Sequence, residues 1–282
     1  MIQNAWGGSN VESWISKEKL HELGKTDTNS YYLKKAADMS VKTAPNHDPS
    51  ALFNGMLHPL IPYTIKGAIW YQGEANTVNS SEYTSLFAGM IGDWRTRWGI
   101  GDFPFYFVQL APYDYPVGRD NSALVREAQT QVEASVRNTG MAVILDGGLE
   151  NDVHPPYKIP VGERLAIIAL ANTYDVKGYP KGCPTYQTFT TERGRLRVQF
   201  YHVENGLYLT GDSVNGLEIA GEDKVFHSAD GQITAQGQLL VSSEKVANPV
   251  AVRYGFTDWV QGNLFNTFDL PVSSFRTDDW DQ

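Results

Sequence analysis

Cysteine and long apolar runs are the two features that this sequence most clearly lacks. Cys183 is the only cysteine among the 282 residues, so an internal disulfide is excluded and cysteine pairing indicates no redox compartment. No run of about 18 apolar residues occurs, so the sequence predicts no membrane-spanning helix. The given sequence also opens without a basic segment followed by an apolar one, so no signal peptide is predicted within it.

The sequence also has fewer positively charged residues than negatively charged ones. Lysine and arginine number 23 against 32 aspartates and glutamates, which leaves a net charge of −9. A surface of this sign repels phosphate groups, so we expect neither nucleic acid nor an anionic membrane surface as a partner. By contrast, 41% of the residues are hydrophobic, which is enough to bury a large core, and a chain of this length predicts two structural units.

The first 180 residues show the pattern of an α/β sheet. Apolar runs typical of strands lie at residues 65–71, 103–111 and 141–146. Segments with helical periodicity follow them at about residues 81–98, 123–136 and 161–174. Strands that alternate with helices of this length indicate parallel βαβ units. The polar and uneven residues 17–54 are interpreted as short helices and a long connection.

Helical patterns stop near residue 180. Short alternating runs such as L-R-V-Q-F (196–200) and V-A-V-R-Y (250–254) take over, separated by glycine, asparagine and aspartate turns. This pattern predicts an antiparallel β region over residues 181–282, arranged as a sandwich.

Candidate functional residues follow the predicted strands, because ligands bind at the carboxyl ends of strands in open α/β sheets. Residues 72–76, Q-G-E-A-N, come after the first strand. Residues 147–158 come after the third and hold Glu150, Asp152 and His154 within five positions. A histidine followed by prolines is held rigidly, which suits a general base. The alternatives are a helix capping box at residues 72–76 and a metal-like or merely solvated cluster at Asp152 and His154.

The segment A-W-G-G-S-N-V-E-S-W (residues 5–14) raises the question whether Ser9 is a nucleophile. Small neighbours allow the sharp turn that exposes such a hydroxyl. Serine or asparagine after glycines is equally ordinary chemistry for a helix N-cap. This segment alone leaves both interpretations open.

Three motifs together resemble the sialate O-acetylesterases of the SGNH hydrolase superfamily. They are W-G-G-S-N-V-E-S-W (6–14), W-Y-Q-G-E-A-N (70–76) and D-V-H-P (152–155), which V-G-E-R-L-A follows. The similarity continues in F-N-G-M-L-H-P-L-I-P (53–62), P-F-Y-F-V-Q-L-A (104–111), L-V-R-E-A-Q (124–129) and V-A-V-R-Y-G-F (250–256). The resemblance covers almost the whole chain. It implies a flavodoxin-like three-layer α/β core in residues 1–180, followed by the antiparallel β region.

The resemblance implies that Ser9 is not the nucleophile. In this family the nucleophile belongs to a G-Q-S-N-M-type block on the first strand, and the W-G-G block comes after it. Residues 1–282 contain no such serine block, so the chain is either a fragment that starts after that strand or a diverged member without a nucleophile. We expect this chain by itself to be catalytically incomplete, with an open strand edge where the first strand belongs.

The reaction implied is removal of acetyl groups from acetylated sugars or polysaccharides by Ser-His-Asp chemistry, in a periplasmic or secreted protein that uses no metal or other cofactor. The family pattern assigns the general base to His154 and its acidic partner to Asp152. The spacing D-V-H is shorter than the superfamily's D-x-x-H, which makes the role of Asp152 less certain than that of His154. Catalysis by a Ser-His dyad without an acidic partner is therefore an alternative. For the oxyanion hole the pattern indicates Gly8 and Gln72, with Asn76 as second choice.

Other residues of these motifs are expected to bind substrate or organise loops, namely Gly7, Ser9, Gly73 and Glu74, whereas Arg126 and Glu127 are interpreted as structural. Three other functions stay open. An acetylxylan-type esterase fits the same motifs, and a carbohydrate-binding protein without catalysis would explain the absent serine. A metal-dependent hydrolase would use Glu150, Asp152 and His154, but the other histidines lie in no comparable motif.

Overall fold

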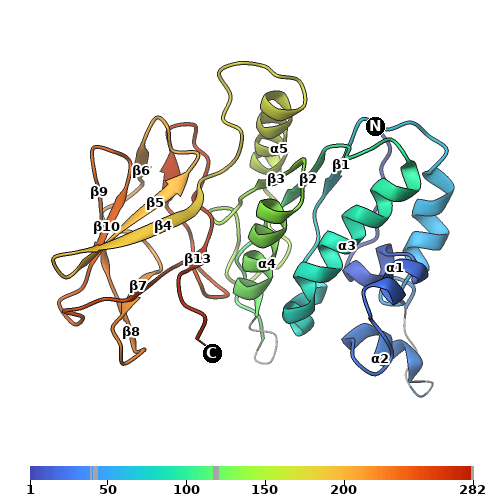
Figure 1. Cartoon of the computed structure of the whole chain (residues 1–282), viewed down its shortest axis with the longest axis horizontal. Coiled ribbons are helices and arrows are strands. Elements are labelled where there is room, and N and C mark those ends of the chain that lie inside the picture. The colour runs from blue at the N-terminus through green and yellow to red at the C-terminus, as the bar shows by residue number, and fades with distance from the viewer. Residues whose placement is uncertain (39, 41–43, 117–120, 281–282) are drawn as a thin grey trace.

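The computed structural model describes residues 1–38, 40, 44–116 and 121–280. Helices and parallel strands make up the first part of the chain, and antiparallel strands make up the rest (Figure 1). The last helix ends at Asn172 and the first antiparallel strand begins at Thr185, on either side of the predicted change near residue 180. The predicted α/β class with a following antiparallel region is therefore confirmed.

A parallel three-stranded sheet forms the centre of the α/β part. Its strands are β1 (Ala68–Trp70), β2 (Phe105–Val108) and β3 (Thr139–Ala142), in the order β1-β2-β3. Each strand is shorter than the apolar run that predicted it, because pairing ends where the neighbouring strand ends. β3 also begins before the predicted run at 141–146, since its pairing with β2 starts at Thr139.

Three long helices cover the sheet, namely α3 (Ser80–Trp98), α4 (Ser122–Ser135) and α5 (Ile159–Asn172). Successive side chains of β2 point to opposite faces. Phe107 packs against Phe87 of α3 with ring centroids 4.9 Å apart, whereas Tyr106 and Val108 cluster with Leu165 of α5. The sheet is therefore the middle of three layers. In the described part of the chain, no helix is both long and apolar enough to cross a membrane.

Short helices make up much of the described part of residues 11–79. They are the 3₁₀ helices η1 (Val11–Trp14), η3 (His58–Leu60) and η4 (Glu74–Asn79), the α-helices α1 (Lys17–Glu22) and α2 (Tyr31–Ala37), and the π-helical turn η2 (Phe53–Leu57). Trp14 of η1 packs edge-on against Trp70 of β1, with ring centroids 5.8 Å apart. This contact anchors η1 beside the sheet.

Two four-stranded antiparallel sheets form most of the second part (Figure 1, yellow to red). One has the order β4 (Thr185–Glu192), β5 (Arg195–Tyr201), β10 (Leu239–Ser242), β9 (Asp230–Ile233). The other has the order β13 (Phe275–Arg276), β11 (Ala251–Tyr254), β7 (Leu217–Ala220), β8 (Phe226–Ser228). A two-stranded sheet pairs β6 (Leu207–Leu209) with β12 (Leu264–Asn266).

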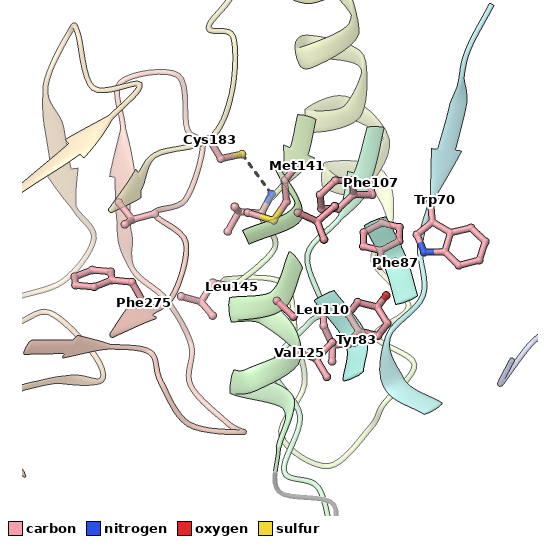
Figure 2. Close-up of a cluster of buried hydrophobic side chains, with 14 of the residues drawn as sticks. Trp70, Tyr83, Phe87, Phe107, Leu110, Val125, Met141, Leu145, Cys183 and Phe275 are labelled. Carbon is pink, nitrogen blue, oxygen red and sulfur yellow. Dashed lines mark hydrogen bonds between the residues drawn. The ribbon is translucent and has the colours of Figure 1, made fainter. Parts of the chain in front are cut away.

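One hydrophobic core joins the two parts of the chain. It runs from Trp70 through Phe107 to Phe275 of β13 (Figure 2). Cys183 lies at the junction, only 1% exposed, and its Sγ accepts a hydrogen bond from the backbone N–H of Val143 at 3.3 Å (Figure 2). The lone cysteine therefore serves packing.

Polar contacts cross the same junction. Arg126 of α4 is fully buried, and its Nε donates to Ser274 Oγ at 3.2 Å. Next to it, Glu127 accepts two hydrogen bonds from Arg276, at 2.8 and 2.9 Å. Both residues thus hold α4 against the β region, which accords with their interpretation as structural.

One edge of the parallel sheet is open. Among the described strands, β1 pairs only with β2. Ile69, in the middle of β1, is 65% exposed, although an apolar side chain between two helical layers is normally covered. The exposed edge leaves an apolar hollow beside the candidate site.

Candidate functional site

The Ser9 hydroxyl is engaged inside the protein. Ser9 is 7% exposed, and its Oγ accepts a hydrogen bond from the indole N–H of Trp14 at 2.9 Å. The cap of η1 is instead Asn10, whose Oδ1 accepts from Ser13 N at 2.9 Å. Serine and asparagine can both cap a helix, but here the Ser9 hydroxyl is hydrogen-bonded to the Trp14 indole and Asn10 is the cap. Ser9 is therefore not the cap, and among the described residues its hydroxyl makes no hydrogen bond to a histidine or a carboxylate.

Gly8 gives this segment its turn. Its φ of +67° lies in the left-handed region, where side chains other than glycine are strained. The carbonyl oxygen of Gly8 accepts from Asn46 Nδ2 at 3.3 Å and lies 3.0 Å from His47 Nε2. These contacts hold the loop from residue 7 to residue 9 against the segment around residue 46.

Gln72 joins the first two motifs. It follows β1 and is almost fully buried, and its Nε2 donates to Ser9 O at 2.9 Å and to Asn76 Oδ1 at 2.7 Å. Its Oε1 accepts from Tyr83 OH at 2.9 Å. Both amide hydrogens of Gln72 thus have acceptors in this arrangement. An incoming oxygen has to take the place of one of them.

Asn76 lies behind Gln72. It has no exposed surface, and its Nδ2 donates to Glu12 Oε2 at 2.9 Å and to Asn79 Oδ1 at 3.1 Å. Its Oδ1 accepts from Gln72 and from Val11 N at 2.9 Å. With both hydrogens bound inside the protein, Asn76 supports Gln72 and does not face the cavity.

The capping-box alternative for residues 72–76 is wrong. The residue that precedes η4 is Gly73, which has no side chain, and in the described structure no side chain caps this helix end. Asn76 of the motif instead binds Glu12 and Val11 of η1, because η1 packs directly against this loop.

Asp152 and His154 lie together, but their side chains are not hydrogen-bonded. Asp152 Oδ1 accepts from the backbone N–H of His154 at 2.8 Å, whereas His154 Nδ1 is 4.0 Å from the same oxygen. The side chains are 55% and 90% exposed. The imidazole is therefore held neither by a hydrogen bond to Asp152 nor by burial, and the following prolines restrain only the backbone.

Two cavities flank the end of β1. The first, of about 390 Å³, is lined by residues that include Trp6, Ser9, Ile69 and Gln72. The second, of about 370 Å³, is lined by the segment from Pro155 to Lys158, next to His154 in the chain. Tyr71 and Val161 line both cavities and so separate Gln72 from the histidine segment. Residues of all three motifs thus border two adjoining hollows, but Asp152 and His154 themselves line neither.

Glu74 is the first residue of η4, in the loop that follows β1. Burial raises the pKa of its carboxyl group, while its own backbone N–H and the charges of Lys158 and His154 act in the opposite direction. Lys158 Nζ lies 5.4 Å from the centre of the Tyr71 ring. The loop after β1 and the histidine segment are therefore coupled electrostatically through Glu74 and Lys158.

Sequence reasoning missed Glu12 as a component of this site. Its side chain is fully buried and binds both Asn76 and Asn79. A usable signal was present in the sequence, because Glu12 is the single charged residue in the run V-E-S-W-I. Among the described residues, no group of three or more histidines, cysteines, aspartates or glutamates could hold a metal ion.

Comparisons with known proteins agree with these motifs. The sequence profile of the family described as "Carbohydrate esterase, sialic acid-specific acetylesterase" matches residues 1–167. Sialate O-acetylesterase of Mus musculus is 26% identical over 300 residues, which cover 92% of this chain and 55% of that protein. The enzyme of Homo sapiens is 27% identical over 281 residues, covering 92% of this chain and 52% of that protein.

A solved structure matches nearly the whole fold. The crystal structure of a carbohydrate acetylesterase from Xanthomonas citri has a TM-score of 0.84 and 36% sequence identity, covering 98% of this chain and 60% of that one. The chain spans about half the length of the curated relatives it matches. Because the family profile covers more than half of the chain, the chain belongs to the carbohydrate esterase family of sialic acid-specific acetylesterases.

Proposed function

We propose that this chain contributes the site of a carbohydrate O-acetylesterase, which hydrolyses acetyl esters on sugar hydroxyls, with acetylated sialic acids as the principal substrate class. The observation that carries the proposal is the Gln72–Ser9 hydrogen bond. It joins two family motifs at a cavity, at the sheet end where the histidine motif also lies. The family membership and the names of the relatives support the same reaction.

The nucleophile in this proposal is a serine of the G-Q-S-N-M type outside residues 1–282. Ser9 is unsuited to that role because its Oγ accepts the Trp14 N–H and no described base contacts it. The serine hydroxyl would attack the acetyl carbonyl while His154 takes its proton, and a water would then release acetate from the acyl-enzyme.

His154 is the proposed base and Asp152 its orienting acid. The imidazole would turn by a modest movement to bring Nδ1 within hydrogen-bond reach of Asp152, from the present 4.0 Å. Such tightening is common when catalytic hydrogen bonds form only with substrate bound. A Ser-His dyad stays the alternative.

The proposed oxyanion hole consists of the Gly8 N–H and the Gln72 side chain. Developing negative charge on the acetyl oxygen would compete with Ser9 O for one Gln72 hydrogen, because a charged acceptor binds more strongly than a carbonyl. Gly7, Ser9, Gly73 and Glu74 would shape the surrounding loops, with Asn76 behind them.

The test is acetate release from 9-O-acetylated sialosides by the protein form that carries the serine block. We expect activity that falls by several orders of magnitude in His154→Ala, as on removal of a triad member. The 282-residue chain without the block is the matched control. Equal rates in the wild type and in His154→Ala would reject the assignment.

Two further outcomes of the assay separate the alternatives. Faster release from acetylated xylan than from sialosides would indicate an acetylxylan-type esterase. Binding of acetylated sugars without any acetate release would indicate a carbohydrate-binding protein. Periplasmic or secreted location is part of the proposal, and fractionation of the source cells tests it.

A further inference from the structure

Glu12 is a buried carboxyl group directly behind the candidate site. It lies in η1 and has no exposed surface. Its Oε1 accepts from Asn79 Nδ2 and its Oε2 from Asn76 Nδ2, both at 2.9 Å. Both asparagines belong to η4, 67 and 64 residues away in sequence. Glu12 therefore links η1 to the loop that carries Gln72.

The Glu12 carboxyl fixes which way the Asn76 amide faces. The pKa of Glu12 is raised to about 7, and above this pH its ionised carboxylate only accepts hydrogen bonds, so Asn76 Nδ2 must face Glu12 and Oδ1 must face away. On that other side, Oδ1 meets two donors, Gln72 Nε2 at 2.7 Å and Val11 N at 2.9 Å. A turned amide would set donor against donor on one side and acceptor against acceptor on the other.

Asn76 in turn orients Gln72. With Asn76 Oδ1 in this position, the NH₂ group of Gln72 is the end that faces Asn76 and Ser9. The opposite end, Oε1, accepts from Tyr83 OH at 2.9 Å. Because Gln72 and Ser9 line the first cavity, this orientation decides whether a donor or an acceptor stands beside it.

We propose that Glu12 is a positioning residue of the site: through Asn76 it holds the Gln72 side chain with its NH₂ group toward Ser9 and the cavity. Only the use of Gln72 as a donor to substrate rests on the proposed esterase function. The orientation itself is independent of activity and is measured separately.

The test measures, at about pH 8 where Glu12 is ionised, how fast the Gln72 side-chain amide hydrogens exchange with water, by NMR on ¹⁵N-labelled protein. Gln72→Glu identifies these resonances by their loss. Glu12→Gln keeps the shape of the side chain but turns one acceptor into a donor. We expect exchange to accelerate about tenfold, the factor that corresponds to one lost hydrogen bond. The double variant Glu12→Gln/Asn76→Asp exchanges donor and acceptor, and we expect it to restore the wild-type rate.

Glu133→Gln is the matched control. Burial also raises the pKa of Glu133, but this residue is half-buried in α4 and accepts from Met141 N at 2.7 Å, with no described hydrogen bond to Glu12, Asn76 or Gln72. Its substitution is expected to leave Gln72 exchange unchanged. In the esterase assay, Glu12→Gln is expected to lower kcat with little change in KM, and the double variant to recover kcat.

Unchanged Gln72 exchange in a folded Glu12→Gln protein overturns the proposal, as does a double variant no better than the single one. If Glu12→Gln does not fold, the double variant is compared with Asn76→Ala. Wild-type exchange in the double variant supports the proposal, and exchange as fast as in Asn76→Ala overturns it. If the exchange results are as expected but the protein shows no esterase activity, the proposed function is rejected and the positioning role of Glu12 is kept.

Discussion

The side-chain amide of Gln72 donates a hydrogen bond to the main-chain carbonyl of Ser9 at 2.9 Å, across 63 residues of sequence. This bond joins the W-G-G and Q-G-E-A-N motifs beside one cavity. Neither motif, taken alone as sequence, indicates that it binds the other. The strength of this bond and its use by a substrate are open to direct measurement.

Gln72→Ala is expected to lower esterase activity about 10² to 10³-fold, the usual effect of removing one oxyanion donor. It is also expected to destabilise the fold by about 1–3 kcal/mol, because Ser9 O and Asn76 Oδ1 lose a buried donor. Initial rates and denaturant unfolding measure the two effects. Gln131→Ala, which removes an exposed hydrogen bond from Thr84 Oγ1 at 2.9 Å, is the control; it should leave the rate unchanged and alter the free energy of unfolding by no more than about 0.5 kcal/mol. An unaltered rate in Gln72→Ala would remove Gln72 from the oxyanion hole.

Asp152→Asn is expected to lower activity less than His154→Ala does. The present contact of Asp152 is to the backbone N–H of His154, and an asparagine oxygen can still accept that bond. Because both side chains are largely exposed, neither change should alter the free energy of unfolding by more than about 0.5 kcal/mol. Rates on a small acetyl ester decide the point. Losses of equal size would show that the carboxylate is needed for the full triad.

The 282-residue chain is expected to take no covalent label from a fluorophosphonate probe. Such probes need an activated serine, and the Ser9 hydroxyl accepts the Trp14 N–H without a described base beside it. Intact-protein mass spectrometry after incubation provides the measurement, with the form that carries the serine block as positive control. One equivalent of label on Ser9 would restore Ser9 as the nucleophile.

Stability is expected to fall as the pH rises from about 4.5 to about 7. Burial raises the pKa of Glu12 and of Glu133 from 4.5 to about 7. In this window the folded protein keeps protons that the unfolded chain releases, so the free energy of unfolding decreases with pH. Each group contributes up to about 1.4 kcal/mol per pH unit, and the slope ends above pH 7.

Denaturant unfolding at pH 5 and at pH 7.5 checks this dependence. Glu133→Gln is expected to flatten the slope, because glutamine does not titrate and Glu133 lies outside the candidate site. A slope identical to that of the wild type would show that Glu133 is not protonated in the folded protein at pH 5.

Helix positions could be predicted closely from the sequence, whereas strand ends could not. The expected helix at about 81–98 is Ser80–Trp98, because helical periodicity and the left-handed Gly99 that ends the helix are local features. The expected strand at 65–71 is only Ala68–Trp70. Strand ends depend on the partner, and nothing in residues 65–71 indicates where β2 stops pairing.

The candidate site divides in the same way. Residue types and their spacing determined by themselves that a Gln-Gly-Glu loop follows β1, that an Asp-Val-His segment follows β3, and that the net charge is negative. These are properties of neighbouring residues, set by side-chain chemistry and backbone preference. Only the tertiary structure decided that Trp14 takes the Ser9 hydroxyl, that Glu12 meets Asn76, and that the His154 imidazole stands away from Asp152. The Glu12–Asn76 contact joins segments 64 residues apart that the packing of η1 against η4 brings together, and a buried donor binds whichever acceptor that packing places beside it. The Ser9–Trp14 bond and the separation of His154 from Asp152 lie within single segments and depend on how the side chains are oriented.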